Sequence, residues 1–236
     1  MFCLLLDSSV SWQLFFQDAA SSTMLHLVGF YEHAMLVLVL VISVVGVSLF
    51  SLGLTRFSCQ NYLKQDKLEE FWTFTPAILL VILGYPSLQL LYRMEETMPP
   101  EFSIKAVGHQ WYWSYEYSDL ASVILDSYIT PTTDLVVGDP RLLDVDHRAC
   151  LPYHTTARVV VTSMDVIHSF AVPSLGVKVD AIPGRLNQVA VSPTICGVLF
   201  GMCSEICGAN HAFMPIRLEV VSPSTFQEWV SECVFE

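Results

Sequence analysis

The sequence predicts a membrane-anchored protein in which a two-helix transmembrane hairpin is followed by an all-β domain. Three observations lead to this fold class: an apolar composition, two long uncharged runs in the first hundred residues, and short strand-like segments beyond them. Hydrophobic residues make up 53% of the 236 residues and charged residues only 14%, which is far from the balance of a soluble globular domain.

The first 28 residues are expected to form an interfacial arm. Trp12, Phe15 and Phe16 stand near acidic residues there, and aromatic side chains of this kind gather at the headgroup level of membranes. A poorly ordered terminus is the alternative. Residues 1–28 contain no Lys or Arg, so neither a secretory signal peptide nor an Arg-rich transit peptide is indicated.

Two uncharged runs within residues 29–93 predict the hairpin. Ala34 to Leu54 and Phe71 to Tyr92 are each long enough to cross about 30 Å of hydrocarbon as a helix. Pro86 is expected to kink the second helix, which membrane helices tolerate. Buried helices of a soluble protein are the alternative, and the presence of two such runs disfavours it.

The connection between the runs sets the expected orientation. It carries Arg56, Lys64 and Lys67, whereas the 54 residues before it have no Lys or Arg. By the positive-inside rule this loop faces the cytoplasm or matrix, and both termini lie on the opposite side. Glu69 and Glu70, just before the second run, have the pattern of ordinary interfacial charges.

Residues 94–236 are expected to form the β domain, after a linker from Met94 to Pro100. The segments there are short and separated by Gly and Pro turn signals, as in a β-sandwich or barrel. A terminal amphipathic helix is expected from the capping-box pattern of Ser224 to Gln227 and from one apolar face, made of Phe226, Trp229, Val230, Cys233 and Val234. The expected strands are Phe102–Val107, Trp111–Tyr117, Val123–Ile129, Ala157–Met164, Gln188–Val191, Val198–Met202 and Ile216–Val221.

Charge and cysteine content narrow the function. The net charge of -12 argues against a nucleic-acid partner. Between Met94 and Glu236 there are 17 acidic and seven basic residues, so the β domain is expected to attract a cationic partner. An odd, scattered set of seven cysteines does not indicate a disulfide framework; they are Cys3, Cys59, Cys150, Cys196, Cys203, Cys207 and Cys233.

The stretch from Gly201 to Leu218 carries the clearest chemical motif. Cys203, Cys207, His211 and Met214 fall within twelve residues in the pattern Cys-x3-Cys-x3-His-x2-Met. Thiolates, an imidazole and a thioether form a soft ligand set that favours copper over magnesium, calcium or manganese. A disulfide or a structural zinc site is the alternative, although a thioether is a poor zinc ligand. Met214 as ordinary core filling also stays open.

A copper site of the Cys, His and Met type needs another histidine from a distant segment. Six histidines lie outside the motif. His168 has the best position, because it follows the strongest strand-like segment and precedes a compact turn expected over residues 169–175. His147 and His154 lie in a polar stretch that resembles a surface loop. Position alone does not decide the choice.

Long segments of the chain resemble cytochrome c oxidase subunit II. The resemblance is carried by GHQWYWSYEY (108–117), TSMDVIHSFAVPSLGVKVDAIPGRLNQ (162–188) and GMCSEICGANHAFMPI (201–216). In the N-terminal half it is carried by WQLFFQDAASS (12–22) and EEFWTFTPAILLVILGYPSLQLLY (69–92). It covers nearly the whole chain, and its motifs are long and specific.

The resemblance implies a cupredoxin-like Greek-key β-sandwich outside the membrane with a binuclear copper centre, CuA. Six residues occupy the positions of its ligands: His168, Cys203, Glu205 through its backbone carbonyl, Cys207, His211 and Met214. The two cysteines would bridge both coppers. His168 and Met214 would complete one copper, and His211 and the Glu205 carbonyl the other.

The same resemblance implies further roles and partners. The Glu205 side chain would reach a magnesium ion shared with the catalytic subunit, Trp111 would receive electrons, and Glu69, with Glu70 beside it, would mark the entrance of a proton path. From the residues alone, Glu205 is a loop acid and Trp111 a packed aromatic. The implied function is to accept electrons from cytochrome c and pass them to haem in subunit I, where oxygen is reduced to water and protons are pumped.

No haem-binding or oxygen-binding constellation occurs in the sequence, so the chain alone is expected to be inert toward oxygen and to hold no catalytic residue. Three other functions fit the motifs less well. A quinol oxidase subunit lacks the copper ligands present here, and nitrous oxide reductases lack the membrane hairpin and carry a large additional domain. A copper chaperone needs exposed, exchangeable ligands.

Two further expectations concern location and departures from the family. A Met1 start without a targeting signal fits an organelle-encoded protein of the mitochondrial inner membrane, with both termini and the copper domain in the intermembrane space. The bacterial plasma membrane is the alternative. Cys196, His147 and Cys150 depart from the family pattern, and Cys196 is expected to be a buried strand residue.

Overall fold

The computed structural model describes residues 9, 12–58, 64–95, 99–117, 119–120 and 123–235. The chain divides into two units, of which one comprises Met1–Leu25 with Thr97–Glu236 and the other comprises His26–Glu96. Both β-sheets belong to the first unit, and most of the two long helices belongs to the second.

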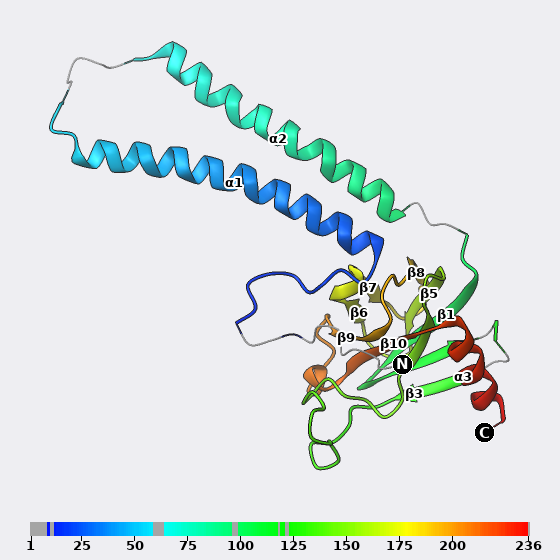
Figure 1. Ribbon diagram of the computed structural model, residues 1–236. Helices are drawn as coiled ribbons and strands as arrows, with labels where there is room; N and C mark the ends of the chain where they lie inside the picture. The colour runs from blue at the N-terminus through cyan, green and yellow to red at the C-terminus, as the bar shows by residue number, and fades with distance from the viewer. Residues whose placement is uncertain are drawn as a thin grey trace. The chain divides into compact units, whose positions relative to one another are not determined.

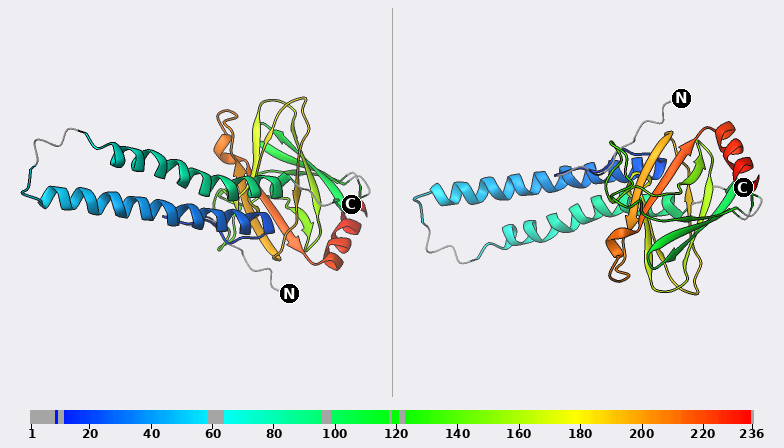
Figure 2. Two further views of the ribbon diagram at one scale, coloured as in Figure 1. Left: turned by 90° about the horizontal axis from the view of Figure 1, so that it is seen from above. Right: turned by 90° about the horizontal axis from the view of Figure 1, so that it is seen from below.

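Two long helices form the apolar hairpin (Figure 1). Helix α1 runs from Ser22 to Leu54 and α2 from Asp66 to Glu95, and both are long and apolar enough to cross a membrane. They run in opposite directions (Figure 2). Many large apolar side chains of these helices are exposed; Ile42, for example, is 69% exposed. Such exposure is favourable in contact with lipid and unfavourable in water. Both helices extend beyond the uncharged runs that predict them, because the helical ladder continues into the polar interface.

Within the described residues, ten strands form two five-stranded sheets, which are the two layers of the β domain in Figure 1. The first sheet has the order β3-β2-β1-β5-β8, with bounds Val123–Ser127, Tyr112–Tyr117, Phe102–His109, Ala157–Ser163 and Asn187–Val191. The second has the order β4-β10-β9-β6-β7, with bounds Ala149–Pro152, Pro215–Val221, Gly197–Cys203, His168–Val172 and Val177–Ala181.

The two sheets enclose an apolar core. Trp113 on β2 and Phe170 on β6 are almost completely buried, and their rings meet edge to face with centroids 5.5 Å apart. Pairing is parallel between β1 and β5 and between β4 and β10, and antiparallel between the other neighbours. The predicted fold class, an apolar hairpin followed by a β-sandwich, is confirmed.

Strands β4, β6 and β7 differ from the sequence prediction. The first lies in the stretch expected as a surface loop, so that expectation is wrong. Strand β6 takes up residues 169–172 of the compact turn expected over residues 169–175, and only Pro173–Leu175 form a turn, the 3-10 helix η1. Every residue of β4 and β6 is buried, so neither strand shows the alternation of apolar and polar residues that reveals a strand with one wet face. Cys196 also differs, since it is half-buried and directly precedes β9.

The N-terminal arm joins the β domain at its last residues. The Ala20 N–H donates to the Ser174 carbonyl at 2.8 Å, and the Ser21 hydroxyl donates to the Leu175 carbonyl at 2.7 Å. Trp12 is 95% exposed. The interfacial role of residues 1–28 stays a prediction. Three features of the sequence analysis fall outside the described residues: Cys3, Cys59 and residues 96–98 of the linker.

The terminal helix α3 (Pro223–Phe235) begins slightly earlier than its sequence pattern indicates. Ser222 caps it by accepting a hydrogen bond from the Thr225 N–H at 3.3 Å, and proline suits the first helical position. The expected capping box at Ser224 is therefore not the cap. Four of the five expected apolar residues pack on the core, namely Phe226, Trp229, Val230 and Cys233, whereas Val234 is 45% exposed.

Candidate metal centre

The ligand motif forms the loop between two paired strands. Strand β9 ends at Cys203, and β10 begins at Pro215, directly after Met214. The strands are antiparallel, with Pro215 opposite Met202, so both ends of the loop are fixed at the same end of this strand pair. The Cys203 N–H donates to the Met214 carbonyl at 3.3 Å and closes the loop.

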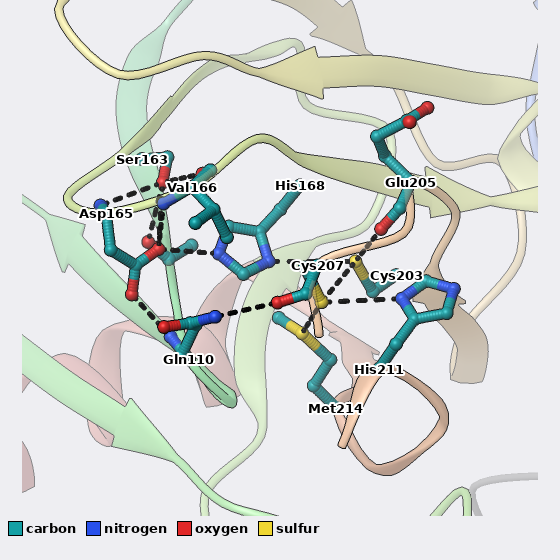
Figure 3. A network of polar contacts seen from close by, with 11 residues as sticks. Gln110, Ser163, Asp165, Val166, His168, Cys203, Glu205, Cys207, His211 and Met214 are labelled. Atoms are coloured by element: carbon teal, nitrogen blue, oxygen red, sulfur yellow. Dashed lines mark hydrogen bonds and ion pairs between the residues drawn. The ribbon is translucent and has the colours of Figure 1, made fainter. Parts of the chain in front are cut away.

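The loop turns its soft donor atoms toward one another (Figure 3). The Cys203 and Cys207 sulfurs lie 4.0 Å apart. The Cys207 sulfur is 3.5 Å from the Met214 sulfur and 3.4 Å from His211 Nδ1. His211 stands at the start of a short 3-10 helix, η2 (His211–Phe213), which begins where the His211 N–H donates to the Gly208 carbonyl at 3.2 Å.

His168 reaches the same place from another part of the fold. It is the first residue of β6, which pairs with β9 so that Phe170 lies opposite Cys203. Its Nδ1 is 3.8 Å from the Cys203 sulfur, and its Nε2 is 2.8 Å from Asp165 Oδ1. A Cβ at Gly108 would come within 2.8 Å of the imidazole ring, so only glycine permits this packing.

The arrangement suits a soft metal. One donor atom each from His168, Cys203 and Cys207 lies within 4.8 Å of the other two. All three residues are buried, and Met214 is only 1% exposed. Buried thiolates, imidazole and thioether are the donors that copper prefers, and the two sulfurs stand close enough to share ions. The residues present therefore fit a copper centre.

The two thiols differ in acidity. Burial by itself disfavours the Cys203 thiolate, but hydrogen bonds from His168 and from backbone groups outweigh it and lower the pKa of Cys203 to about 7. Burial and the negative charge of Cys203 raise the pKa of Cys207 to about 12. The first thiolate is thus available near neutral pH, and the second forms only when a cation replaces its proton.

The hydrogen bond between Asp165 and His168 stabilises the charged form of each side chain. Although burial disfavours both charged forms, their hydrogen bond helps to raise the pKa of His168 and lower the pKa of Asp165. The Gln110 N–H also donates to Asp165 Oδ2 at 2.7 Å. The hydrogen bond between Asp165 and His168 Nε2 fixes the imidazole so that Nδ1 faces the sulfurs. Asp165 is not among the residues predicted from the sequence, although its position three residues before His168 could have revealed it.

Glu205 and Trp111 both lie at the loop. The Glu205 carbonyl is 3.4 Å from the Cys203 sulfur, while its exposed side chain points away from the cluster (Figure 3). The Trp111 indole packs against Gly208, where a Cβ would come within 3.2 Å of it. Gln110 ties the two segments together, since its side-chain amide donates to the Cys207 carbonyl at 2.8 Å.

The remaining candidates belong to other segments of the chain. Glu69 and Glu70 are exposed residues of α2 in the other unit. Among the described residues, the group of metal-ligating side chains contains neither His147 nor His154. The structure thus brings together all six residues predicted around the copper centre.

Comparisons with known protein families match both units. The family described as cytochrome c oxidase subunit II, periplasmic domain, matches residues 102–221, and the family described as its transmembrane domain matches residues 9–90. Cytochrome c oxidase subunit 2 of Myxine glutinosa is 47% identical over 219 residues, which are 92% of this chain and 96% of that relative.

Two solved structures resemble the β domain. The periplasmic domain of cytochrome oxidase subunit II (CoxB) of Bradyrhizobium japonicum is 46% identical, with a TM-score of 0.55 over 58% of this chain and 95% of that one. A mixed disulfide intermediate between a thioredoxin-like protein and subunit II of cytochrome c oxidase contains a chain that is 44% identical, with a TM-score of 0.52 over 60% of this chain and 96% of that one.

Proposed function

Because this chain belongs to the cytochrome c oxidase subunit II family, we propose that it is the subunit through which electrons reach the oxidase. It accepts electrons from cytochrome c at a binuclear copper centre and passes them to haem in subunit I, where oxygen reduction to water drives proton pumping. The family implies a copper centre, a membrane anchor and other oxidase subunits. The observation that carries the proposal is the buried cluster of soft donors at the ends of β6, β9 and β10.

Six residues would hold the two coppers. Cys203 and Cys207, whose sulfurs lie 4.0 Å apart, would supply the thiolates for both ions. His168 and Met214 would complete the ligands of one copper, and His211 with the Glu205 carbonyl those of the other. The donors support a soft metal, and the second copper rests on family membership.

When bound, this centre supplies a one-electron redox couple. The protein holds the donors in place before and after electron transfer, because His168 and Met214 are anchored on or beside paired strands. Burial of both sulfurs excludes water from the site. Rigid donors and a dry surrounding leave little to reorganise when the charge changes, which favours rapid electron transfer.

Trp111 is proposed as the point where electrons arrive. Its indole packs against Gly208, which directly follows Cys207, so the aromatic ring adjoins the ligand loop. The excess of acidic residues between Met94 and Glu236 supports a basic partner such as cytochrome c. Turnover with cytochrome c is expected to slow as ionic strength rises, and encounter rates unaffected by salt would count against this acidic docking face.

Two carboxylates are proposed to act at the boundary with subunit I. The Glu205 side chain points away from the sulfurs and is exposed, as a ligand shared with another subunit must be (Figure 3). It would hold magnesium, which prefers oxygen ligands. Glu69, with Glu70 beside it, would stand at the entrance of the proton path near the start of α2.

We place the protein in the mitochondrial inner membrane, with both termini and the β domain in the intermembrane space. The basic connection between the helices supports this orientation, and the long match to the hagfish relative supports a mitochondrial membrane over a bacterial one.

The decisive experiment is metal analysis with EPR on the full chain purified in detergent and reconstituted with copper. Two coppers per chain and a mixed-valence signal split by two equivalent copper nuclei are expected. Cys207→Ser should abolish that signal, while Cys196→Ser, outside the cluster, should keep it. One zinc per chain, or no bound metal, would overturn the proposal. Rapid loss of copper to a mild chelator would favour a copper carrier instead.

A further inference from the structure

Gln110 joins two distant parts of the chain beside the metal centre. Its backbone N–H donates to Asp165 Oδ2 at 2.7 Å, and its side-chain amide donates to the Cys207 carbonyl at 2.8 Å (Figure 3). The two acceptors lie 55 and 97 residues further along the chain. Cys207 belongs to the ligand loop, and Asp165 holds the imidazole of His168, which begins β6. Gln110 therefore contacts both the loop side and the strand side of the centre.

The contacts of Gln110 close a ring around the donor atoms. From Gln110 the ring passes to Asp165, whose Oδ1 is 2.8 Å from His168 Nε2. His168 Nδ1 is 3.8 Å from the Cys203 sulfur, and that sulfur lies 4.0 Å from the Cys207 sulfur. The Cys207 carbonyl completes the ring by accepting from the Gln110 amide. Because the members of such a network restrain one another, a shift of one ligand is opposed by the rest.

The backbone near Gln110 keeps its amide within reach of the loop. Gln110 lies in the turn between β1 and β2, where His109 and Tyr112 are paired in register. Across from it, a Cβ at Gly208 would come within 3.2 Å of the Gln110 amide nitrogen, so glycine permits this approach. Gln110 is nevertheless an exposed residue. Its side chain can therefore be replaced without opening a cavity in the core.

We propose that Gln110 is a positioning residue of the copper centre, an inference that rests on the proposed function. The amide holds the Cys207 end of the ligand loop against the Asp165–His168 pair, so the donors keep their spacing when an electron arrives. Its N–H dipole also offsets the partial negative charge of the Cys207 carbonyl. The first effect limits reorganisation, and the second stabilises the reduced centre, which carries one more negative charge.

Two substitutions test these effects. Gln110→Met keeps the length of the side chain and the backbone hydrogen bond to Asp165, but its side chain cannot donate to the Cys207 carbonyl. It should lower the midpoint potential of the copper centre. Gln110→Glu adds a negative charge at the same place and should lower the potential further. For Gln110→Glu we expect the equilibrium constant for electron uptake to fall by about tenfold, which is about 59 mV for one electron.

The measurements use the full copper-loaded chain in detergent. A redox titration followed by optical absorption gives the midpoint potential, and EPR shows whether the two copper nuclei stay equivalent. In Gln110→Met the splitting should become unequal, because the loop side can shift relative to the strand side. Gln110→Asn, whose amide is one methylene shorter, is a second neutral variant and should lower the potential in the same way. Gln188→Met, at an exposed glutamine of β8, is the matched control and should alter neither measurement.

Two outcomes would overturn the positioning role while the unaltered chain keeps its copper signal. One is an unchanged potential and an unchanged EPR splitting in the Gln110 variants. The other is slower reduction of these variants by reduced cytochrome c at an unchanged potential, since that result would make Gln110 a docking residue only. Absence of a copper signal in the unaltered chain would instead overturn the proposed function, and this inference with it.

Discussion

The two histidines of the metal centre are held in different ways. His168 is completely buried, begins strand β6, and is fixed by Asp165 on one side and by Gly108 on the other. His211 is half-buried and stands on a one-turn 3-10 helix within the ligand loop. The first ligand is positioned by the sandwich, and the second by the short chain that also carries the cysteines.

The two histidines therefore differ in how freely they can move. A strand residue with a hydrogen-bonded ring has little freedom, so His168 as a proposed ligand would fix the position of a bound metal. A loop residue can follow its neighbours, and Gly208, with φ of +125°, provides the backbone turn that the loop needs before His211. Mutations of His168 and of His211 should therefore have different effects on the protein.

The largest effect is expected from comparing His168→Ala with His211→Ala in the metal-free chain. Loss of the buried ring leaves a cavity and removes one hydrogen bond from Asp165, which should lower the free energy of unfolding by about 2–4 kcal/mol. Loss of the half-buried ring should change it by less than about 0.5 kcal/mol. Unfolding followed by tryptophan fluorescence measures both values, and equal losses would show that the two histidines are held alike.

A smaller effect is expected from Asp165→Asn. The amide keeps the size of the side chain but loses the charge that orients the imidazole of His168, so copper affinity should fall by about tenfold. Competition with a copper chelator measures this change. Asp180→Asn, an exposed carboxylate on β7, is the matched control and should leave affinity unaltered. An unchanged affinity in Asp165→Asn would remove Asp165 from the positioning role.

The smallest effect concerns protons on the two thiols. In the metal-free chain, one thiolate should appear with a midpoint near pH 7, from Cys203, while Cys207 stays protonated up to about pH 12. Since the folded pKa of Cys203 lies below its usual 9.0, the stability that its thiolate contributes is present above pH 9 and is lost as the pH falls through 7.

Ultraviolet absorbance of the thiolate follows this titration. His168→Ala should move the first midpoint up toward 9, because the imidazole no longer stabilises the thiolate, whereas His211→Ala should move it less. Two thiols that titrate together near 9 would show that the strand side of the centre does not act on Cys203.

Features that depend on neighbouring residues could be predicted from the sequence. Two cysteines, a histidine and a methionine within twelve residues can meet in one loop without help from distant segments, so the copper motif could be predicted from the sequence. The hairpin could be predicted for a similar reason, since the thickness of a bilayer fixes the length of an apolar helix that crosses it. Such local patterns determine the local structure without contacts from distant segments.

Features that depend on distant segments were decided by the tertiary structure. His168 meets Cys203 because β6 pairs with β9, and residues 169–175 had been expected as a turn. The close packing of Gly108 against the His168 ring also arises between distant segments. Strand pairing joins residues far apart in the chain, and strands buried on both faces lose the alternation that would reveal them. The chain itself thus determined its membrane anchor and its ligand loop, and the sandwich decided which histidine completes the site and how firmly it is held.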